Sequence, residues 1–581
     1  MRKVVPVLLV LGAAGIGAFA LSQRSTSEAA QGNQEVSQAD VVGDTITGEI
    51  LIDAKDDVSE ADLDELAAIA GTSLRPNSEL SSDDKFEVAD VDPANEDAIL
   101  ARLSADPRVE HAEPMAVYRA SFVPDDPLYS SKQWHLKRVG AESAWDESCG
   151  MGVTVAVVDT GIACFDKGPF TKGSDLQGTR CEGGFNFVDK KAPGYDDQGH
   201  GTHVAGTIAQ TTNNGKGTAG LAYCATLMPV KVLNKSGFGT TANVAEGIRF
   251  AADHGAQVIN LSLGGPIKSD ILEAAVKHAH DKGVVIVAAA GNSGRSVGYP
   301  AAYPDVIAVS ATDSNDNIAS FSSRGPEVAI GAPGVNVTQQ TICNGGRDKC
   351  EIFGTFNGTS MASPHVAGAA AMVVGMGITD PDAVRSKLQS TANPKSEKNL
   401  YGAGILRVDS AVSSTLLSHM LLRGLALLAL LALVAKRIKS QKGELLKGKA
   451  MMLGALVGGF GLLPFLPFTG LLARMGDWRI AGEILMRPLG ELDLVLGAGL
   501  HRFLPLANAA PAVVAALLMF GSKRLRPWVG GLALGSAAVC SQIAFSGDVA
   551  FFAGGLALRV WMVVNVLACA WIARLALDKR G

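Results

Sequence analysis

The sequence predicts an α/β protein with a parallel sheet, preceded by a small α+β domain and followed by an all-α transmembrane bundle. From residue 153 to about 392, apolar strand patterns alternate with helical ones, which is typical of a parallel sheet with helices on both faces. A shorter mixed stretch precedes this region, and a strongly apolar stretch follows it from Leu416 onward. With 581 residues the chain is long enough for three such parts.

The chain begins with two positive charges, an apolar run and an Ala-Phe-Ala ending, MRKVVPVLLVLGAAGIGAFA. This pattern predicts a secretory signal cut after Ala20 or an uncleaved anchor, and either one would export the rest of the N-terminal half. Residues 21–43 are rich in Ser, Gln, Glu and Ala and are interpreted as a linker.

Residues 44–120 are predicted to form the small α+β domain. GEILIDA has the pattern of a strand, and SEADLDELAAIAG that of a helix with Ser59 as its N-cap and a glycine at its end. Residues 92–120 add a second helix and a strand.

Five apolar runs predict the strands of the parallel sheet. Each is rich in β-branched or small apolar residues and short enough for a buried strand. They lie at residues 153–158, 226–233, 257–263, 284–289 and 306–310.

Three motifs contain the candidate catalytic residues. Asp159 follows the first strand in VTVAVVDTGIA, at the edge of the sheet where α/β proteins bind ligands. His200 begins a helical segment, HGTHVAGTIA. In FNGTSMASPHVAG, Ser360 follows a glycine turn at the start of a helix, where the helix dipole favours developing negative charge. Such a serine is a nucleophile only when a base and an orienting acid accompany it.

The order Asp159, His200, Ser360 is one of the chain orders of an acid–base–nucleophile triad. These three blocks resemble the subtilisin-like serine proteases (subtilases), over roughly residues 125–413. The resemblance implies that 121–413 is a peptidase domain acting on proteins or peptides. It also implies that Asn292, in GVVIVAAAGNSG, forms an oxyanion hole with the backbone N–H of Ser360.

The same residues have other interpretations. An aspartic protease would need a second DTG or DSG segment in a matching context, and the sequence has none. His200 and His203 could bind a metal, but they lack the HExxH pattern. A third hypothesis is a catalytically silent, peptide-binding membrane receptor or transporter. The intact Asp159, His200, Asn292 and Ser360 argue against it.

The resemblance also assigns a specificity pocket to small or apolar residues. NLSLGGP resembles the edge strand that pairs with an extended substrate. One wall would be Ser262, Leu263 and Gly264, the other Ala289, Ala290 and Gly291, and the floor Gly298. Because no carboxylate lies among them, we expect a bulky apolar or aromatic residue before the cut.

The same resemblance implies that residues 44–120 are an inhibitor propeptide, cut between about Ala120 and Asp125; a generic α+β domain is the alternative. It implies structural calcium and no catalytic cofactor. Asp126, Asp175 and Asn214 match the family's calcium positions and offer the oxygen ligands that calcium prefers. Surface carboxylates without an ion are the alternative.

Six cysteines lie in the exported region, which favours disulfides. Cys343 and Cys350 flank a short Gly-rich loop and are the first expected pair. Cys164 and Cys181 bracket an apparent insertion. Cys149 and Cys224 each precede a strand and could bridge neighbouring strand starts.

Residues 414–581 are predicted to cross the cell membrane five times, with the catalytic domain outside the cytoplasm. The expected spans are 416–435, 450–473, 503–521, 527–545 and 549–573. Lysine and arginine clusters alternate between their ends in agreement with this orientation. Residues 474–502 are expected to form an external loop with an interfacial helix.

Arg559 lies either in the middle of the fifth span, paired with a carboxylate, or near the membrane interface if that span begins later. The net charge of −6 gives no reason to expect nucleic-acid binding.

Overall fold

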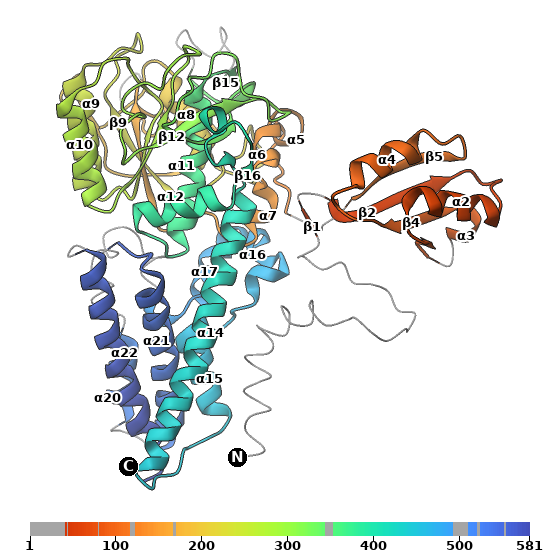
Figure 1. The fold of residues 1–581 in the computed structure, drawn as a ribbon. Coiled ribbons are helices and arrows are strands. Elements are labelled where there is room, and N and C mark those ends of the chain that lie inside the picture. The colour runs from red at the N-terminus through yellow and green to blue at the C-terminus, as the bar shows by residue number, and fades with distance from the viewer. Residues whose placement is uncertain are drawn as a thin grey trace. The chain divides into compact units, whose positions relative to one another are not determined.

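The structure, a computed structural model, describes residues 41–42, 45–78, 81–116, 122–166, 170–342, 352–491, 509–519, 523–550 and 554–580. The chain divides into two compact units, Met1–Ala120 and Ser121–Gly581 (Figure 1). The expected signal or anchor segment and most of the expected linker lie outside the described residues.

The first unit is a small antiparallel sheet covered by helices. Strand β2 pairs with β5 on one side and β4 on the other, and β3 pairs with β4. The strands are β1 (Val41–Val42), β2 (Thr45–Ala54), β3 (Leu74–Pro76), β4 (Phe86–Asp90) and β5 (Val109–Ala116), and the helices α2 (Glu60–Ala70), α3 (Ser81–Asp84) and α4 (Glu96–Ser104). This confirms the predicted α+β pattern.

Helix α2 begins and ends as its sequence predicts. The Ser59 hydroxyl accepts a hydrogen bond from Asp62 N, and the Asp62 carboxylate accepts one from Ser59 N, which completes a capping box. Gly71 ends the helix at φ 75°, a left-handed conformation that favours glycine.

A parallel sheet forms the centre of the second unit, in the order β16-β17-β13-β12-β11-β10-β6-β9-β7, with β8 also paired to β9. Among these described strands, only β16 runs antiparallel to its neighbour. The strands are β6 (Thr154–Asp159), β7 (Arg180–Cys181), β8 (Phe185–Asn186), β9 (Thr226–Lys231), β10 (Val258–Leu261), β11 (Val285–Ala289), β12 (Ile307–Thr312), β13 (Val328–Pro333), β16 (Asn393–Pro394) and β17 (Gly404–Ile405). The predicted fold class is confirmed.

Alternate side chains of each strand enter different cores. Val155 and Val157 of β6 join the cluster that includes helices α8 and α11, whereas Ala156 and Val158 join the one that includes α9 and α10. The principal helices of this α/β domain are α8 (His200–Ala209), α9 (Thr241–Asp253), α10 (Asp270–Asp281), α11 (Thr359–Gly375) and α12 (Pro381–Ser390). Shorter helices are α5 (Tyr129–Lys132), α6 (Trp134–Arg138), α7 (Ala141–Trp145) and α13 (Lys398–Tyr401).

A separate hairpin, β14 (Val337–Gln340) with β15 (Phe353–Phe356), leads into α11. Disulfides join Cys149 to Cys224 and Cys164 to Cys181. The first bridge confirms the expected link between strand starts. The expected Cys343–Cys350 pair lies outside the described residues.

The apolar C-terminal part differs from the five expected spans. Within the described ranges, three helices are long and apolar enough to cross a membrane: α14 (Val408–Ser440), α21 (Arg526–Ser546) and α22 (Gly555–Leu577). The other helical segments are α15 (Lys449–Phe460), η1 (Leu466–Thr469), α16 (Leu471–Arg474), η2 (Gly476–Trp478), α17 (Arg479–Leu485), η3 (Leu489–Glu491), α20 (Ala510–Met519) and η5 (Lys523–Leu525). We call α15 to α22, together with α14 from Leu416 onward, the helical module.

The second expected span, 450–473, is not one helix. Helix α15 has 12 residues and ends before Gly461, whose φ of 92° leaves the helical region. Pro464 and Pro467 follow and cannot donate to a helical hydrogen-bond ladder. The third expected span, 503–521, is described only over part of its length, where α20 lies.

Helices α15 and α21 approach each other through glycines. A Cβ on Gly531 would lie 2.0 Å from the Met451 carbonyl oxygen, and one on Gly535 would lie 2.5 Å from that of Ala455. On the facing helix, a Cβ on Gly454 would meet the Trp528 carbonyl at 2.3 Å. Small residues thus allow backbone contact, as in many membrane helix pairs.

The helix that contains Arg559 begins later than the expected fifth span, as the second of the two expectations required. Helix α22 begins at Gly555, so Arg559 lies near its start. Its Nη1 donates to the carbonyl oxygens of Ala544 and Phe545, at 2.9 Å each, where α21 ends. A cation at a helix C-terminus is stabilised by the unpaired carbonyls and the dipole there.

We predict that Gly531→Ala destabilises the helical module by about 1–3 kcal/mol, the usual cost of overpacking, because the new methyl group meets backbone rather than a movable side chain. The measurement is the midpoint of thermal unfolding in detergent micelles. Gly555→Ala is the matched control, since a Cβ there meets nothing within 4 Å. Equal midpoints for both variants would contradict the glycine contact.

Candidate active site

Asp159 and His200 are brought together at the carboxyl edge of the sheet. Asp159 ends β6 and is fully buried. Its Oδ1 lies 2.7 Å from His200 Nδ1 and accepts a hydrogen bond from Thr160 N, also at 2.7 Å. The imidazole, at the start of α8, is a quarter exposed, so it can reach a bound molecule.

Two glycines allow the start of α8 to lie against the turn after β6. A Cβ on Gly201 would lie 2.2 Å from the Gly161 carbonyl oxygen, so any larger residue would push α8 away from the turn after β6. Gly161 itself has a φ of 104°, and its Cβ would lie 2.3 Å from the Tyr195 carbonyl. The glycines of the DTG and HG motifs are therefore required by backbone contact.

The electrostatic surroundings favour a protonated His200. Burial lowers the pKa of its imidazole, but the charge of Asp159 and the hydrogen bond to it outweigh burial and raise the pKa above the usual 6.5. Asp196, buried nearby, adds to this increase. Its carboxylate is held by Gly199 N at 3.0 Å and by the Thr202 hydroxyl at 2.6 Å.

Ser360 is the second residue of α11 and is held against the end of β10. Its hydroxyl donates to the Ser262 carbonyl oxygen at 3.1 Å, and the Ser262 hydroxyl donates to the Ser360 carbonyl at 2.8 Å. Among the described residues, no hydrogen bond joins Ser360 to His200. Catalytic hydrogen bonds are often long or misaligned without substrate and tighten when it binds.

Asn292 lies beside the same helix start. Thr359 donates to Asn292 Oδ1 through both its backbone N–H and its hydroxyl, at 2.9 Å each. Two donors on the oxygen leave the amide nitrogen, Nδ2, to face the turn, where a Cβ on Gly358 would lie 3.4 Å from it. An amide donor and the N-terminus of α11 therefore flank Ser360, an arrangement that can stabilise an anion.

Thr359 was absent from the candidates named from the sequence. Its hydroxyl also accepts a hydrogen bond from Gly291 N at 3.1 Å, so it links the end of β11 to the start of α11. Nothing in the pattern of a Gly-Thr-Ser turn distinguishes this link from an ordinary threonine at a helix start.

The residues expected to line the specificity pocket come from three adjacent segments. Gly265 and Tyr299 exchange two backbone hydrogen bonds, of 2.9 and 2.8 Å, and Gly298 N donates to the Ala290 carbonyl at 2.9 Å. A Cβ on Gly298 would lie 3.1 Å from the Gly265 carbonyl. The segments 262–264 and 289–291 therefore meet beside Gly298, beyond the ends of β10 and β11.

The three candidate calcium ligands also lie together. Asp126 accepts hydrogen bonds from Asn213 N and Asn214 N, and the Asn214 side chain donates to Asp175 Oδ1 at 2.9 Å. Burial, with a contribution from the Asp126 charge, raises the pKa of Asp175 to about 6. No group of three His, Cys, Asp or Glu side chains suited to a metal occurs in the described ranges. The donor set fits calcium if amide and backbone oxygens complete it.

His203 has a different environment from that expected of a metal ligand paired with His200. Its ring stacks on Phe356 at a centroid distance of 4.3 Å, and its Nε2 lies 3.0 Å from the Gly354 carbonyl oxygen. Burial lowers the pKa of this imidazole to about 3. His203 thus contributes to the contact between α8 and β15.

Comparison with known proteins gives consistent matches. A family model described as "Subtilase family" matches residues 150–404. The chain is 37% identical over 387 residues to "Thermophilic serine proteinase" of Bacillus sp. (strain AK1), covering 66% of this chain and 92% of the relative. It is 41% identical over 285 residues to "Thermitase" of Thermoactinomyces vulgaris, covering 48% and 96%. A solved protease from Pseudoalteromonas arctica PAMC 21717 aligns with 51% of this chain and 100% of its own, at 32% identity and a TM-score of 0.45.

We predict that the reaction of Ser360 with a fluorophosphonate becomes faster as the pH rises, with a midpoint above 6.5. The reason is that only neutral imidazole can take the serine proton, and Asp159 raises the pH at which His200 loses its own. The measurement is the labelling rate against pH. The control is His278→Gln, which alters a histidine of α10 that pairs with Asp253 of α9. This variant leaves the midpoint unchanged. A midpoint below 6.5 contradicts the assignment.

Proposed function

Because the chain belongs to the subtilase family and is a serine endopeptidase, we propose that Asp159, His200 and Ser360 are its catalytic triad. The observation that carries this proposal is the 2.7 Å contact between Asp159 and His200 at the same sheet edge as Ser360. The intact groups and their contacts favour catalysis over a silent peptide-binding receptor or transporter.

The hydrogen bonds of the proposed triad suggest a separate role for each of its three residues. Asp159 engages Nδ1 of His200, which leaves Nε2 to take the proton from Ser360 as its oxygen attacks the scissile carbonyl. His200 then passes that proton to the leaving amine, and a water molecule releases the acyl group by the same route. Asp159 fixes the tautomer and stabilises the imidazolium without accepting the proton.

Asn292 Nδ2 and the backbone N–H of Ser360 would stabilise the oxyanion that forms during attack. The two hydrogen bonds from Thr359 support this role, because they hold the Asn292 amide in one orientation before substrate binds. A donor fixed in advance loses little free energy to reorganisation in the transition state.

We further propose that the enzyme prefers an apolar residue before the cut. Ser262, Leu263 and Gly264 would face Ala289, Ala290 and Gly291 across that side chain, with Gly298 beneath it. Glycine at 298 supports this proposal, because its backbone already lies close to the Gly265 carbonyl. None of the seven carries a charge that would hold lysine or arginine.

Residues 44–120 are proposed to be an inhibitor propeptide removed between about Ala120 and Asp125, and 121–413 the peptidase domain. The α+β sheet of the first unit supports this proposal. The helical module is proposed to hold the enzyme in the cell membrane with the catalytic domain outside the cytoplasm. Three long apolar helices and the positions of the basic clusters support the tether.

Structural calcium is proposed at Asp126, Asp175 and Asn214. Two buried carboxylates so close together repel each other, and a divalent cation would offset that repulsion. The ion would stabilise the loop after α8 and take no part in the reaction.

We predict that Ser360→Ala abolishes hydrolysis and retains residues 44–120, because self-cleavage needs the same nucleophile. The measurements are the mass of the purified chain and hydrolysis of two matched peptides, with Phe or Arg before the cut. Wild type cuts the Phe peptide faster, since no carboxylate would hold the Arg side chain. Ser131→Ala, which alters an exposed serine of α5, is the control that keeps activity. Undiminished hydrolysis by Ser360→Ala rules out this nucleophile.

We also predict that a calcium chelator lowers the unfolding temperature of the wild type but has little effect on Asp175→Ala, which has lost a ligand. The reason is that an ion bound only to the folded state stabilises it by mass action. Asp281→Ala, which removes an exposed carboxylate from α10, keeps the response to the chelator. If the chelator leaves the wild type unchanged, the calcium site is refuted.

A further inference from the structure

The α/β domain is joined to the helical module by a continuous helix. The first residues of α14, including Val408, Ala411 and Val412, are buried in the core of the α/β domain. Ser413 donates to Glu147 at 2.7 Å, and Lys387 donates to Ser414 at 3.1 Å. The helix then continues to Ser440 without a break. A continuous helix is a stiff connection, unlike a glycine- or serine-rich linker.

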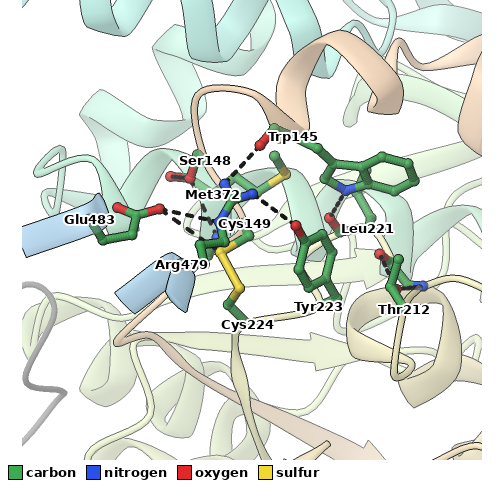
Figure 2. Close-up of a disulfide and its surroundings, with 12 residues drawn as sticks. Trp145, Ser148, Cys149, Thr212, Leu221, Tyr223, Cys224, Met372, Arg479 and Glu483 are labelled. Carbon is green, nitrogen blue, oxygen red and sulfur yellow. Dashed lines mark hydrogen bonds and ion pairs between the residues drawn. A yellow bond between two sulfur atoms is a disulfide. The ribbon is translucent and has the colours of Figure 1, made fainter. Parts of the chain in front are cut away.

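A second attachment comes from α17, whose Arg479 enters the base of the α/β domain beside the Cys149–Cys224 disulfide (Figure 2). Arg479 donates to the Trp145 carbonyl at 2.7 Å and to the Tyr223 hydroxyl at 2.8 Å. Its guanidinium also lies 5.6 Å from the centre of the Tyr223 ring. Glu483, 1% exposed, lies 3.6 Å from Arg479 and balances the buried charge.

A third attachment lies at the turn between α21 and α22. The Asp548 carbonyl oxygen accepts hydrogen bonds from Thr379 N at 2.8 Å and Asp380 N at 3.0 Å, just before α12. Ala550 N donates to the Thr379 hydroxyl at 2.9 Å. Three separate attachments restrict how the α/β domain can turn on the helical module.

Exposed apolar side chains indicate where lipid would begin if the helical module lies in a membrane. On α14 the first is Leu417, 52% exposed, and Lys436 follows about one hydrocarbon thickness further along the helix. Phe465, Phe468 and Trp478 of the segment between α15 and α17 are 49%, 46% and 74% exposed. Tryptophan is enriched at membrane surfaces, and Arg479, the residue after Trp478, enters the α/β domain.

Helix α11 spans the distance from this level to Ser360. Met376, which follows the C-terminus of α11, lines a cavity of about 50 Å³ together with Leu416 and His419 of α14. Ser360 lies at the opposite end of the same 17-residue helix, which is about 25 Å long. We take this length as the distance of Ser360 from the lipid level. Figure 1 agrees, because β15, which leads into α11, lies at the end of the α/β domain remote from α15 and α21.

We propose that the helical module acts as a rigid spacer that holds Ser360 about 25 Å above the membrane surface. The enzyme would therefore cut membrane-anchored proteins only at bonds separated from their anchor by about eight or more residues. This inference rests on the proposed function and names its substrate class, which is extended segments that rise well clear of the bilayer. An extended chain covers at most 3.3–3.6 Å per residue, which sets the minimum of about eight.

A bond closer to the anchor could reach Ser360 only if apolar anchor residues left the lipid. Extracting one large apolar side chain costs about 1.5–3 kcal/mol, which corresponds to more than a tenfold loss of rate. Tilting the α/β domain toward the membrane would instead break the Arg479 and Asp548 contacts.

The test uses the full-length enzyme in lipid vesicles with single-span substrates that share one cleavable sequence. Spacers of 4, 8, 12 and 20 residues separate that sequence from the span, and the same sequence is also supplied as a soluble peptide. We expect the 4-residue substrate to be cut at least about tenfold more slowly than the 20-residue one. A soluble subtilisin added to the same vesicles checks that every site is accessible.

Equal rates for all four spacers, with the soluble peptide also cut, would overturn the spacer and leave the proposed function standing. If neither the soluble peptide nor any anchored substrate is cut, the proposed function fails and the spacer inference fails with it.

A second comparison uses Arg479→Lys, which keeps the charge but loses the guanidinium that reaches two acceptors. We expect the soluble peptide to be cut at the wild-type rate and the difference between the spacers to shrink. Arg249→Ala, an exposed arginine of α9, is the control and leaves the difference unchanged. If Arg479→Lys also leaves the difference unchanged, Arg479 has no role in holding the domain.

Discussion

The backbone contact between Gly161 and Gly201 is the constraint on which the site depends. It brings the start of α8 against the turn after β6, so that a buried carboxylate and a partly exposed imidazole meet at 2.7 Å. The direction of the strands in the parallel sheet positions the other groups of the site. Because β6, β10 and β11 run in the same direction, the residues after their carboxyl ends gather at one edge, where α11 also begins. Chemical groups distant in sequence are assembled by strand direction and two glycines.

The helical module shows how polar side chains are used where apolar ones would be expected. Arg479, Glu483 and Arg423 are all buried, and each has a partner: Arg423 donates to Glu491 at 2.5 Å and to Gln542 at 3.0 Å. Buried pairs add little net stability compared with apolar packing, but breaking one leaves an expensive unpaired charge. Such contacts therefore select one arrangement of the helices and the α/β domain over looser ones.

Much of the fold could be predicted because its signals are local. The apolar runs before Asp159 and Asn292 indicate buried strands, and Ser59 with Gly71 marks both ends of a helix. The second expected span was wrong because hydropathy alone does not register Gly461, Pro464 and Pro467, which follow the end of α15 within an apolar stretch. Thr359 and Arg479 were missed for a different reason. Their importance lies in partners 67 or more residues away, and no periodicity in one chain encodes such pairs.

The position of the first residues of α14 has a consequence for biosynthesis. Val408, Ala411 and Val412 complete the core of the α/β domain, yet they precede Leu417, the first exposed leucine of α14, by only a few residues. During synthesis from the N-terminus, the core lacks its final helix until the chain has almost reached the apolar segment that is proposed to enter the bilayer. If α14 crosses the membrane as proposed, completion of the core and insertion of the helix would be nearly simultaneous, because one helix takes part in both.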